Sequence, residues 1–141
     1  MASFITSMTT AQIAALSTAS IAGLTTADWA AFSTAQIVAL TSAQCAAIST
    51  TGIAGIGTAQ IAAFETQDIK AFSTAAIKAL STLQIAALTT DQLPVLTTGQ
   101  VASFTTAQLA SLTTGDLNAF GTAQFAALTS SQVAGLTTAQ V

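Results

Sequence analysis

The sequence predicts an all-α repeat solenoid, in which very short helices, one per octapeptide, stack in superhelical coils. Two observations lead to this prediction. An eight-residue repeat runs from Met8 to the C-terminus of the 141-residue chain without insertion or deletion, and the same helix-start pattern recurs in almost every repeat. We therefore expect an atypical N-terminal cap at residues 1–7 and a single octapeptide-repeat solenoid domain at residues 8–141.

Two columns of apolar residues run through the repeat. The first column holds every eighth residue from Met8, and the second column lies five residues after each of them. We expect the two columns to form one continuous core. Its predicted members include Leu24, Phe32, Leu40, Ile48, Ile56, Phe64, Phe72 and Leu80 in the first column and Ile37, Cys45, Ile61 and Ile69 in the second. A small residue precedes each octad, with Val95 as the single exception. We expect these small residues to let neighbouring coils approach closely.

The residue after the first column has the character of a helix N-cap. It is Ser or Thr in fourteen of the seventeen octads, and Gln or Asp follows three residues later in fourteen. Ser33 with Gln36, and Thr41 with Gln44, have the spacing of a capping box, in which each residue binds the backbone of the other. A helix that begins in every octad lasts only about one and a half turns, so stacking of coils has to supply its stability.

Other folds account for the period less well. In one long helix the apolar stripe would rotate by about 80° per octad, so no continuous face would form. A β-solenoid with a strand and a turn in each octad remains the alternative, although Ala and Gln are poor strand formers. A whole number of octads per coil, such as three or four, would align the columns, and we favour four.

Composition narrows the range of functions. The chain is 52% hydrophobic and 5% charged, with a net charge of −3. Lys70 and Lys78 are its only basic residues, so nucleic acid is excluded as a main partner. No Lys or Arg precedes Lys70, and we expect no cleavable secretory signal. Thr and Gln interrupt every apolar run, so we also expect no membrane span.

The residue types of common active sites are scarce. The chain has no His and a single Cys, which removes the commonest general base, the commonest nitrogen ligand for metals and any internal disulfide. No pair of carboxylates is accompanied by a set of polar residues suited to acid and base chemistry. We therefore predict that the protein is not an enzyme, with no catalytic residue, no metal site and no cofactor.

Several octads depart from the consensus. We interpret Cys45, Trp29 and the seven Phe residues as core packing. Pro94, together with Val95, makes the octad Leu88–Val95 the predicted point of irregularity, because proline removes a backbone N–H donor.

Charged residues at the repeat positions have two interpretations. We interpret four of them as a solvated surface patch: Glu65, Asp68, Lys70 and Lys78. At the third helical position of three octads, Asp replaces the usual Gln. We expect the carboxylates of Asp28, Asp68 and Asp116 to face the free N–H groups of a helix N-terminus.

The run Leu-Thr-Thr-Ala-Gln-Ile-Ala-Ala-Leu resembles the Ala/Thr/Gln-rich octapeptide arrays of very large secreted or surface adhesin-like proteins of Gram-negative bacteria. The segments that match it most closely are Met8–Leu16, Phe32–Ile48, Ile56–Phe64 and Phe104–Leu112. The resemblance implies an extracellular or bacterial cell-surface location and a structural or adhesive role. Calcium is not implied, because no Gly/Asp nonapeptide accompanies the array.

The leading functional hypothesis is a non-catalytic structural repeat protein that assembles end to end into an extracellular filament or forms a rod-like stalk. It rests on the absence of charged capping repeats, which solenoids usually need at their ends, and it makes a second copy of the chain the expected partner. Two alternatives stay open. Thr pairs such as Thr25–Thr26 and Thr97–Thr98 could form an array that binds ice or a glycan, or the chain could be a passive spacer from a giant adhesin.

Overall fold

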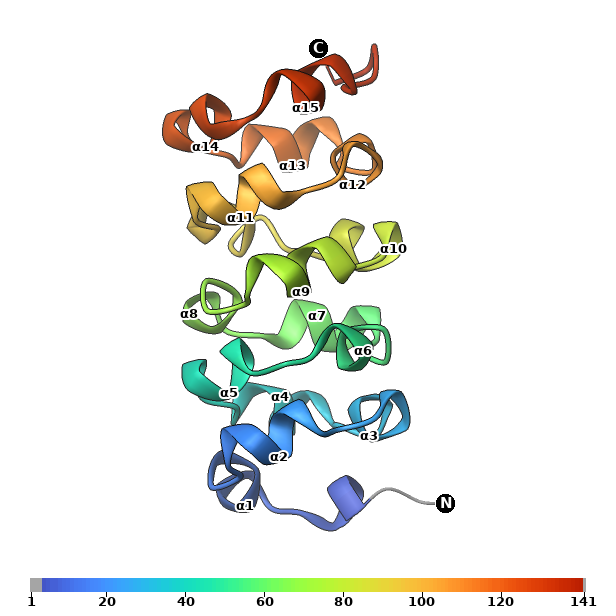
Figure 1. Cartoon of the computed structure of the whole chain (residues 1–141), viewed down its shortest axis with the longest axis vertical. Coiled ribbons are helices and arrows are strands. Elements are labelled where there is room, and N and C mark those ends of the chain that lie inside the picture. The colour runs from blue at the N-terminus through green and yellow to red at the C-terminus, as the bar shows by residue number, and fades with distance from the viewer. Residues whose placement is uncertain (1–3, 141) are drawn as a thin grey trace.

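The computed structural model describes residues 4–140, which form an elongated stack of short helices with no strand among them. Figure 1 shows the helices following one another around a long axis, with the two ends of the described chain at opposite ends of the stack. The predicted all-α solenoid is confirmed, and the β-solenoid alternative is wrong for the described residues. None of the described helices is long and apolar enough to cross a membrane.

Each α-helix of the described octads has only four to six residues. The α-helices are α1 (Thr10–Ala14), α2 (Thr18–Ala22), α3 (Thr26–Ala30), α4 (Thr34–Val38), α5 (Ser42–Ala46), α6 (Thr50–Ile53), α7 (Thr58–Ala63), α8 (Thr66–Ile69), α9 (Thr74–Ala79), α10 (Thr82–Ala86), α11 (Thr98–Ser103), α12 (Thr106–Ala110), α13 (Thr114–Asn118), α14 (Thr122–Ala127) and α15 (Ser130–Ala134). Two 3₁₀-helices, η1 (Phe4–Ser7) and η2 (Leu93–Val95), complete the set in the described chain.

Reciprocal capping starts most of the α-helices. At α5 the backbone N–H of Gln44 donates to the Thr41 hydroxyl at 3.2 Å, and the Thr41 N–H donates to the Gln44 side-chain oxygen at 2.8 Å. Ser33 and Gln36 cap α4 in the same way. Thr41 itself is extended, with φ −88° and ψ 161°. An extended residue at the start of each octad ends the preceding helix, which is why the helices stay short.

The core is formed by the two apolar columns. All twelve of the predicted core residues named above are buried, with exposed fractions between 0% and 6%. Cys45 and Trp29 are also fully buried. Phe4 and Phe125 differ from the expectation, because they are 56% and 44% exposed. Phe4 precedes the first full octad, and no described coil follows Phe125 to cover it.

Helices three octads apart lie against one another in the stack. The extensive contacts include α4 with α7, α5 with α8, α9 with α11 and α11 with α14. The expectation of four octads per coil is therefore wrong for the helix contacts. The sequence period sets the length of an octad, whereas the number of octads per coil depends on the angle at each corner, which the period does not specify.

The octad that contains Pro94 is irregular, as predicted. It forms the 3₁₀-helix η2 in place of an α-helix. Proline lacks the N–H that an α-helix needs at this position, and its ring would clash with the carbonyl group of the preceding turn. The column structure nevertheless persists, because Leu93 in the second column is fully buried.

Candidate functional site

The most distinctive polar feature of the stack is the contact that each buried glutamine makes. Gln84 is 5% exposed, and its side-chain oxygen accepts the N–H of Ser81 at 2.8 Å. Its Nε2 donates to the carbonyl oxygens of Ile53 at 2.8 Å and Ile56 at 2.6 Å, which belong to the preceding coil. One side chain thus caps its own helix and binds the coil beneath it.

The same contact recurs along the described stack. In each case Nε2 donates to the carbonyl groups 31 and 28 residues earlier, at distances between 2.6 and 2.9 Å. We call this series the glutamine ladder; its members are Gln36, Gln44, Gln60, Gln84, Gln92, Gln100, Gln108, Gln124, Gln132 and Gln140.

Of the two carbonyl groups that each ladder residue binds, the one 31 residues earlier also accepts a backbone N–H of its own octad, as Ile77 does from Leu80, whereas the one 28 residues earlier follows the end of its helix. The Leu80 carbonyl, for example, comes just before the extended N-cap Ser81, and it accepts from Gln108 Nε2 at 2.7 Å. Buried backbone acceptors without a partner are costly, so each ladder residue removes a penalty of about 1–3 kcal/mol. The ladder therefore holds successive coils in register.

A family comparison agrees with this organisation. A family model described as the ALTTAQ repeat matches residues 5–42, 21–58, 61–98 and 109–141, which is most of the chain. The chain belongs to the ALTTAQ repeat family. No curated protein and no solved structure matches it.

The ALTTAQ motif can be related to the structure letter by letter. In the segment Ala87–Gln92, Ala is the small residue, Leu is the buried first-column residue, and the first Thr exchanges hydrogen bonds with Gln92 as the N-caps of the α-helices do. Gln92 is the ladder residue, which reaches the carbonyl groups of Ile61 and Phe64. The motif thus contains the cap, one apolar contact and the coil-to-coil hydrogen bonds.

Sequence reasoning assigned Gln36 and Gln44 to local caps and missed their bonds to the coil beneath. The sequence did contain a signal. Either Glu or Gln can complete a capping box, because only an acceptor is needed there. At this position of the ALTTAQ repeat the chain has eleven Gln and no Glu. That preference for Gln indicates that the side-chain amide is also needed as a hydrogen-bond donor.

The ladder is interrupted where another residue replaces Gln. Gly52 makes room for Trp29, because a Cβ atom at Gly52 would lie 2.6 Å from the indole nitrogen. The Trp29 ring stacks on Phe32 with centroids 4.7 Å apart, and its N–H is buried without a partner among the described residues. Gln12 lies in the first coil and is exposed; its side-chain oxygen accepts the N–H of Thr9 at 2.8 Å.

Asp68 occupies a ladder position in the middle of the stack. It is fully buried, which corrects its assignment to a solvated patch. One carboxylate oxygen accepts the Ser42 hydroxyl at 2.9 Å, while the other has no hydrogen-bond partner in the described chain. Asp68 also does not cap its own helix, unlike Asp28 and Asp116, whose carboxylates accept the N–H of their N-caps as expected.

The electrostatic environment of Asp68 favours its neutral form. Burial raises the pKa of the carboxyl group, the Ser42 hydrogen bond lowers it, and the charge of Glu65 raises it further. Burial also raises the pKa of the Cys45 thiol, and the Asp68 charge adds to this effect. Cys45 is therefore a neutral packing residue rather than a reactive thiolate.

Replacing Asp68 by Asn is expected to stabilise the fold by about 1–3 kcal/mol at pH 7, because Asn is neutral and supplies N–H donors at a ladder position. The raised pKa means that the stability contributed by Asp68 is complete below its unfolded pKa of about 3.9 and is lost as the pH rises through its folded pKa. The gain in the free energy of unfolding from Asp68→Asn should therefore decrease as the pH is lowered. Urea unfolding between pH 4 and 8 measures it.

Asp116→Asn is the matched control, because Asp116 is also at a ladder position but is only partly buried and accepts the Thr113 N–H at 3.0 Å. We expect no gain from this control. Equal effects of the two substitutions at every pH would contradict the interpretation of Asp68.

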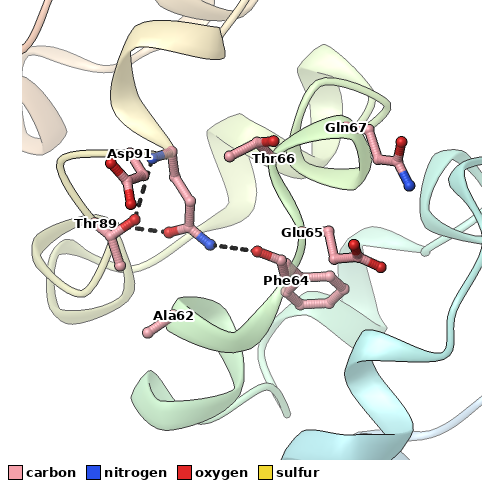
Figure 2. A pocket seen from close by; sticks show the side chains of 8 residues that line it. Ala62, Phe64, Glu65, Thr66, Gln67, Thr89 and Asp91 are labelled. Carbon is pink, nitrogen blue, oxygen red and sulfur yellow. Dashed lines mark hydrogen bonds between the residues drawn. The ribbon is translucent and has the colours of Figure 1, made fainter.

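A surface cleft of about 380 Å³ lies beside the irregular octad. It is lined by Ala62, Phe64, Glu65, Thr66, Gln67, Thr89, Asp91 and Gln92. Figure 2 shows that the carboxylates of Glu65 and Asp91 do not converge on a common point. No group of three or more metal-ligating residues occurs in the part of the chain that the structure describes.

Proposed function

We propose that this ALTTAQ repeat chain is a non-catalytic structural rod that extends end to end into a filament or stalk. The observation that carries the proposal is the constant residue spacing of the ladder contacts. The coil-to-coil contact of Gln36 is repeated with the same residue spacing at Gln140. A contact that recurs with the same spacing wherever Gln occupies the position can be continued by any further coil of the same kind, and such open stacks elongate rather than close.

We place this rod outside the cell or on a bacterial cell surface. The support is the resemblance of the octapeptide to arrays in large secreted and surface proteins. Antibody labelling of intact cells that express the protein tests the location, and labelling only after permeabilisation would contradict it.

Negative-stain electron microscopy of the purified chain over a concentration series tests the structural proposal. We expect short rods at low concentration and filaments of uniform width at high concentration. Light scattering on the same samples should show a mass that rises above the 14.0 kDa of one chain. Particles that stay at one chain mass at every concentration would overturn end-to-end assembly.

A further inference from the structure

We propose that the contact between α5 and α8 is a pH-sensitive joint, which is closed when Asp68 carries a proton and opens locally when Asp68 is ionised. This inference goes beyond the structural role of the rod, because it concerns a conformational change at one level of the stack. It rests on the few ladder bonds at this level and on the buried, partly unpaired carboxyl group of Asp68.

The coil formed by α7, α8 and α9 has fewer ladder bonds than the coil that follows it. Its three ladder positions hold Gln60, Asp68 and Ala76, so one glutamine binds this coil to the coil beneath. The next coil, formed by α10, η2 and α11, has glutamine at all three positions, and each donates to carbonyl groups of the coil beneath. Local opening costs least where the fewest bonds have to break, so we expect it at this level.

Asp68 in its ionised form lacks the donor that its position requires. The carbonyl groups 31 and 28 residues earlier are those of Ile37 and Leu40, and both residues are buried. One oxygen of Asp68 accepts the Ser42 hydroxyl at 2.9 Å, and the other is buried without a partner in the described chain. An ionised carboxylate only accepts hydrogen bonds, whereas a protonated carboxyl group has one O–H donor. A proton on Asp68 therefore removes a buried charge and supplies a donor at a ladder position.

Acidic groups predominate around Asp68. Helix α5, which packs on α8 from beneath, has Cys45 as its titratable group and no charged residue. The octad of η2, which packs on α8 from the other side, contributes the exposed Asp91. The octad of Asp68 itself contains Glu65 and Lys70, both exposed, and the Glu65 charge adds to burial in raising the pKa of Asp68. Ionisation thus places a buried charge where opening to water relieves its cost.

The direction of the pH dependence follows from the two states of the joint. In the open joint Asp68 is hydrated and has the ordinary pKa of about 3.9, whereas in the closed joint its pKa is raised. The closed joint therefore binds more protons, and the fraction of open joints is lowest below about pH 3.9. Above that pH the fraction rises by up to about tenfold per pH unit, and it levels off once the carboxyl group in the closed joint is ionised.

The thiol of Cys45 reports the opening. Cys45 is the one cysteine of the chain, and it is fully buried on α5 near Asp68. Its rate of reaction with dithiodipyridine is measured between pH 4 and 8 and divided by the rate for the urea-unfolded chain at the same pH. This ratio removes the titration of the thiol itself. We expect the ratio to rise by up to about tenfold per pH unit from about pH 4 and then to level off.

Two substitutions test whether Asp68 is the group that titrates. Asp68→Gln restores the usual ladder residue, and Asp68→Asn supplies a neutral amide. In both variants the ratio should be independent of pH, and at pH 7 it should be lower than in the unsubstituted chain. Asp116→Asn is the matched control, because Asp116 is at a ladder position but is only partly buried and caps its own helix. This control should keep the pH dependence of the unsubstituted chain.

A second thiol position shows whether the opening is local. In a chain that carries Cys45→Val, the substitution Val101→Cys moves the thiol to the same apolar column of α11. Val101 is fully buried, and its carbonyl group accepts from the ladder residue Gln132 at 2.9 Å. We expect the labelling ratio at this position to be independent of pH.

Three results would overturn the proposal. A ratio at Cys45 that does not change with pH would show that no such joint exists. An equal rise in both Asp68 variants would assign the titration to another group. A parallel rise in the Val101→Cys chain, or a helical signal in circular dichroism that falls as labelling increases, would show that the whole stack unfolds instead of one joint.

Discussion

Replacing Gln84 by Glu is expected to lower the free energy of unfolding by about 3–5 kcal/mol at neutral pH, which is the usual cost of leaving a buried charge without a partner. Glu can still accept the N–H of Ser81, so the cap survives. It cannot donate to the carbonyl oxygens of Ile53 and Ile56, which would face a carboxylate at close range. Urea unfolding followed by circular dichroism measures the effect.

Gln12→Glu is the matched control for this experiment, because Gln12 makes the same local cap but no bond to a preceding coil. At concentrations where the chain is monomeric, the control should change the free energy of unfolding by less than about 0.5 kcal/mol. The penalty at position 84 should also decrease as the pH falls and reach its minimum below about pH 4.3, the ordinary pKa of Glu, because burial beside carbonyl oxygens raises the pKa of the carboxyl group and the protonated form is neutral and donates one hydrogen bond. Equal stability of the two variants at pH 7 would show that the ladder amides do not hold the coils together.

Gly55→Ala should destabilise the fold by about 3 kcal/mol, because overpacking at a close backbone contact forces neighbouring segments apart. A Cβ atom at Gly55 would overlap the carbonyl oxygen of Thr26 and lie 2.6 Å from its Cα. The contact is with backbone atoms of the preceding coil, so no side-chain rotation can relieve it. Thermal unfolding measures the change.

Gly23→Ala provides the contrast, since Gly23 occupies the same column in the first coil. An added Cβ there would approach nothing closer than 3.6 Å, and φ is −88°. We expect a gain of about 0.5 kcal/mol from the reduced entropy of the unfolded chain. A similar loss at both positions would contradict the assignment of Gly55 to a contact between coils.

The octad period and its capping residues were enough to predict the fold. Ser33 and Gln36 specify a helix start by local chemistry, and the spacing of Phe32 and Ile37 specifies which side is buried. Features that depend on the coil beneath could not be predicted, because the corner angles that set the number of octads per coil leave no periodic signal.

Within the candidate site, the roles of Asp68 and Gly52 also depend on contacts between coils and could not be predicted from the sequence. The burial of Asp68 depends on Ser42, which lies 26 residues earlier and becomes its neighbour only after the chain has coiled. In the sequence, nothing explains the Gly at position 52; in the structure, the Trp29 indole occupies the space that a side chain at this position would need. The ladder itself was present in the sequence, since the preference for Gln over Glu implied a donor.

The gaps in the ladder also give the rod an uneven mechanical strength. An axial pull would load the bonds between coils directly, and a coil that lacks them would separate at lower force. Gly52, Asp68 and Ala76 all fall in one stretch of the chain, where Gln60 is the only intervening ladder residue. Under axial tension the coils in this stretch would therefore separate first, and the coils on either side would stay packed.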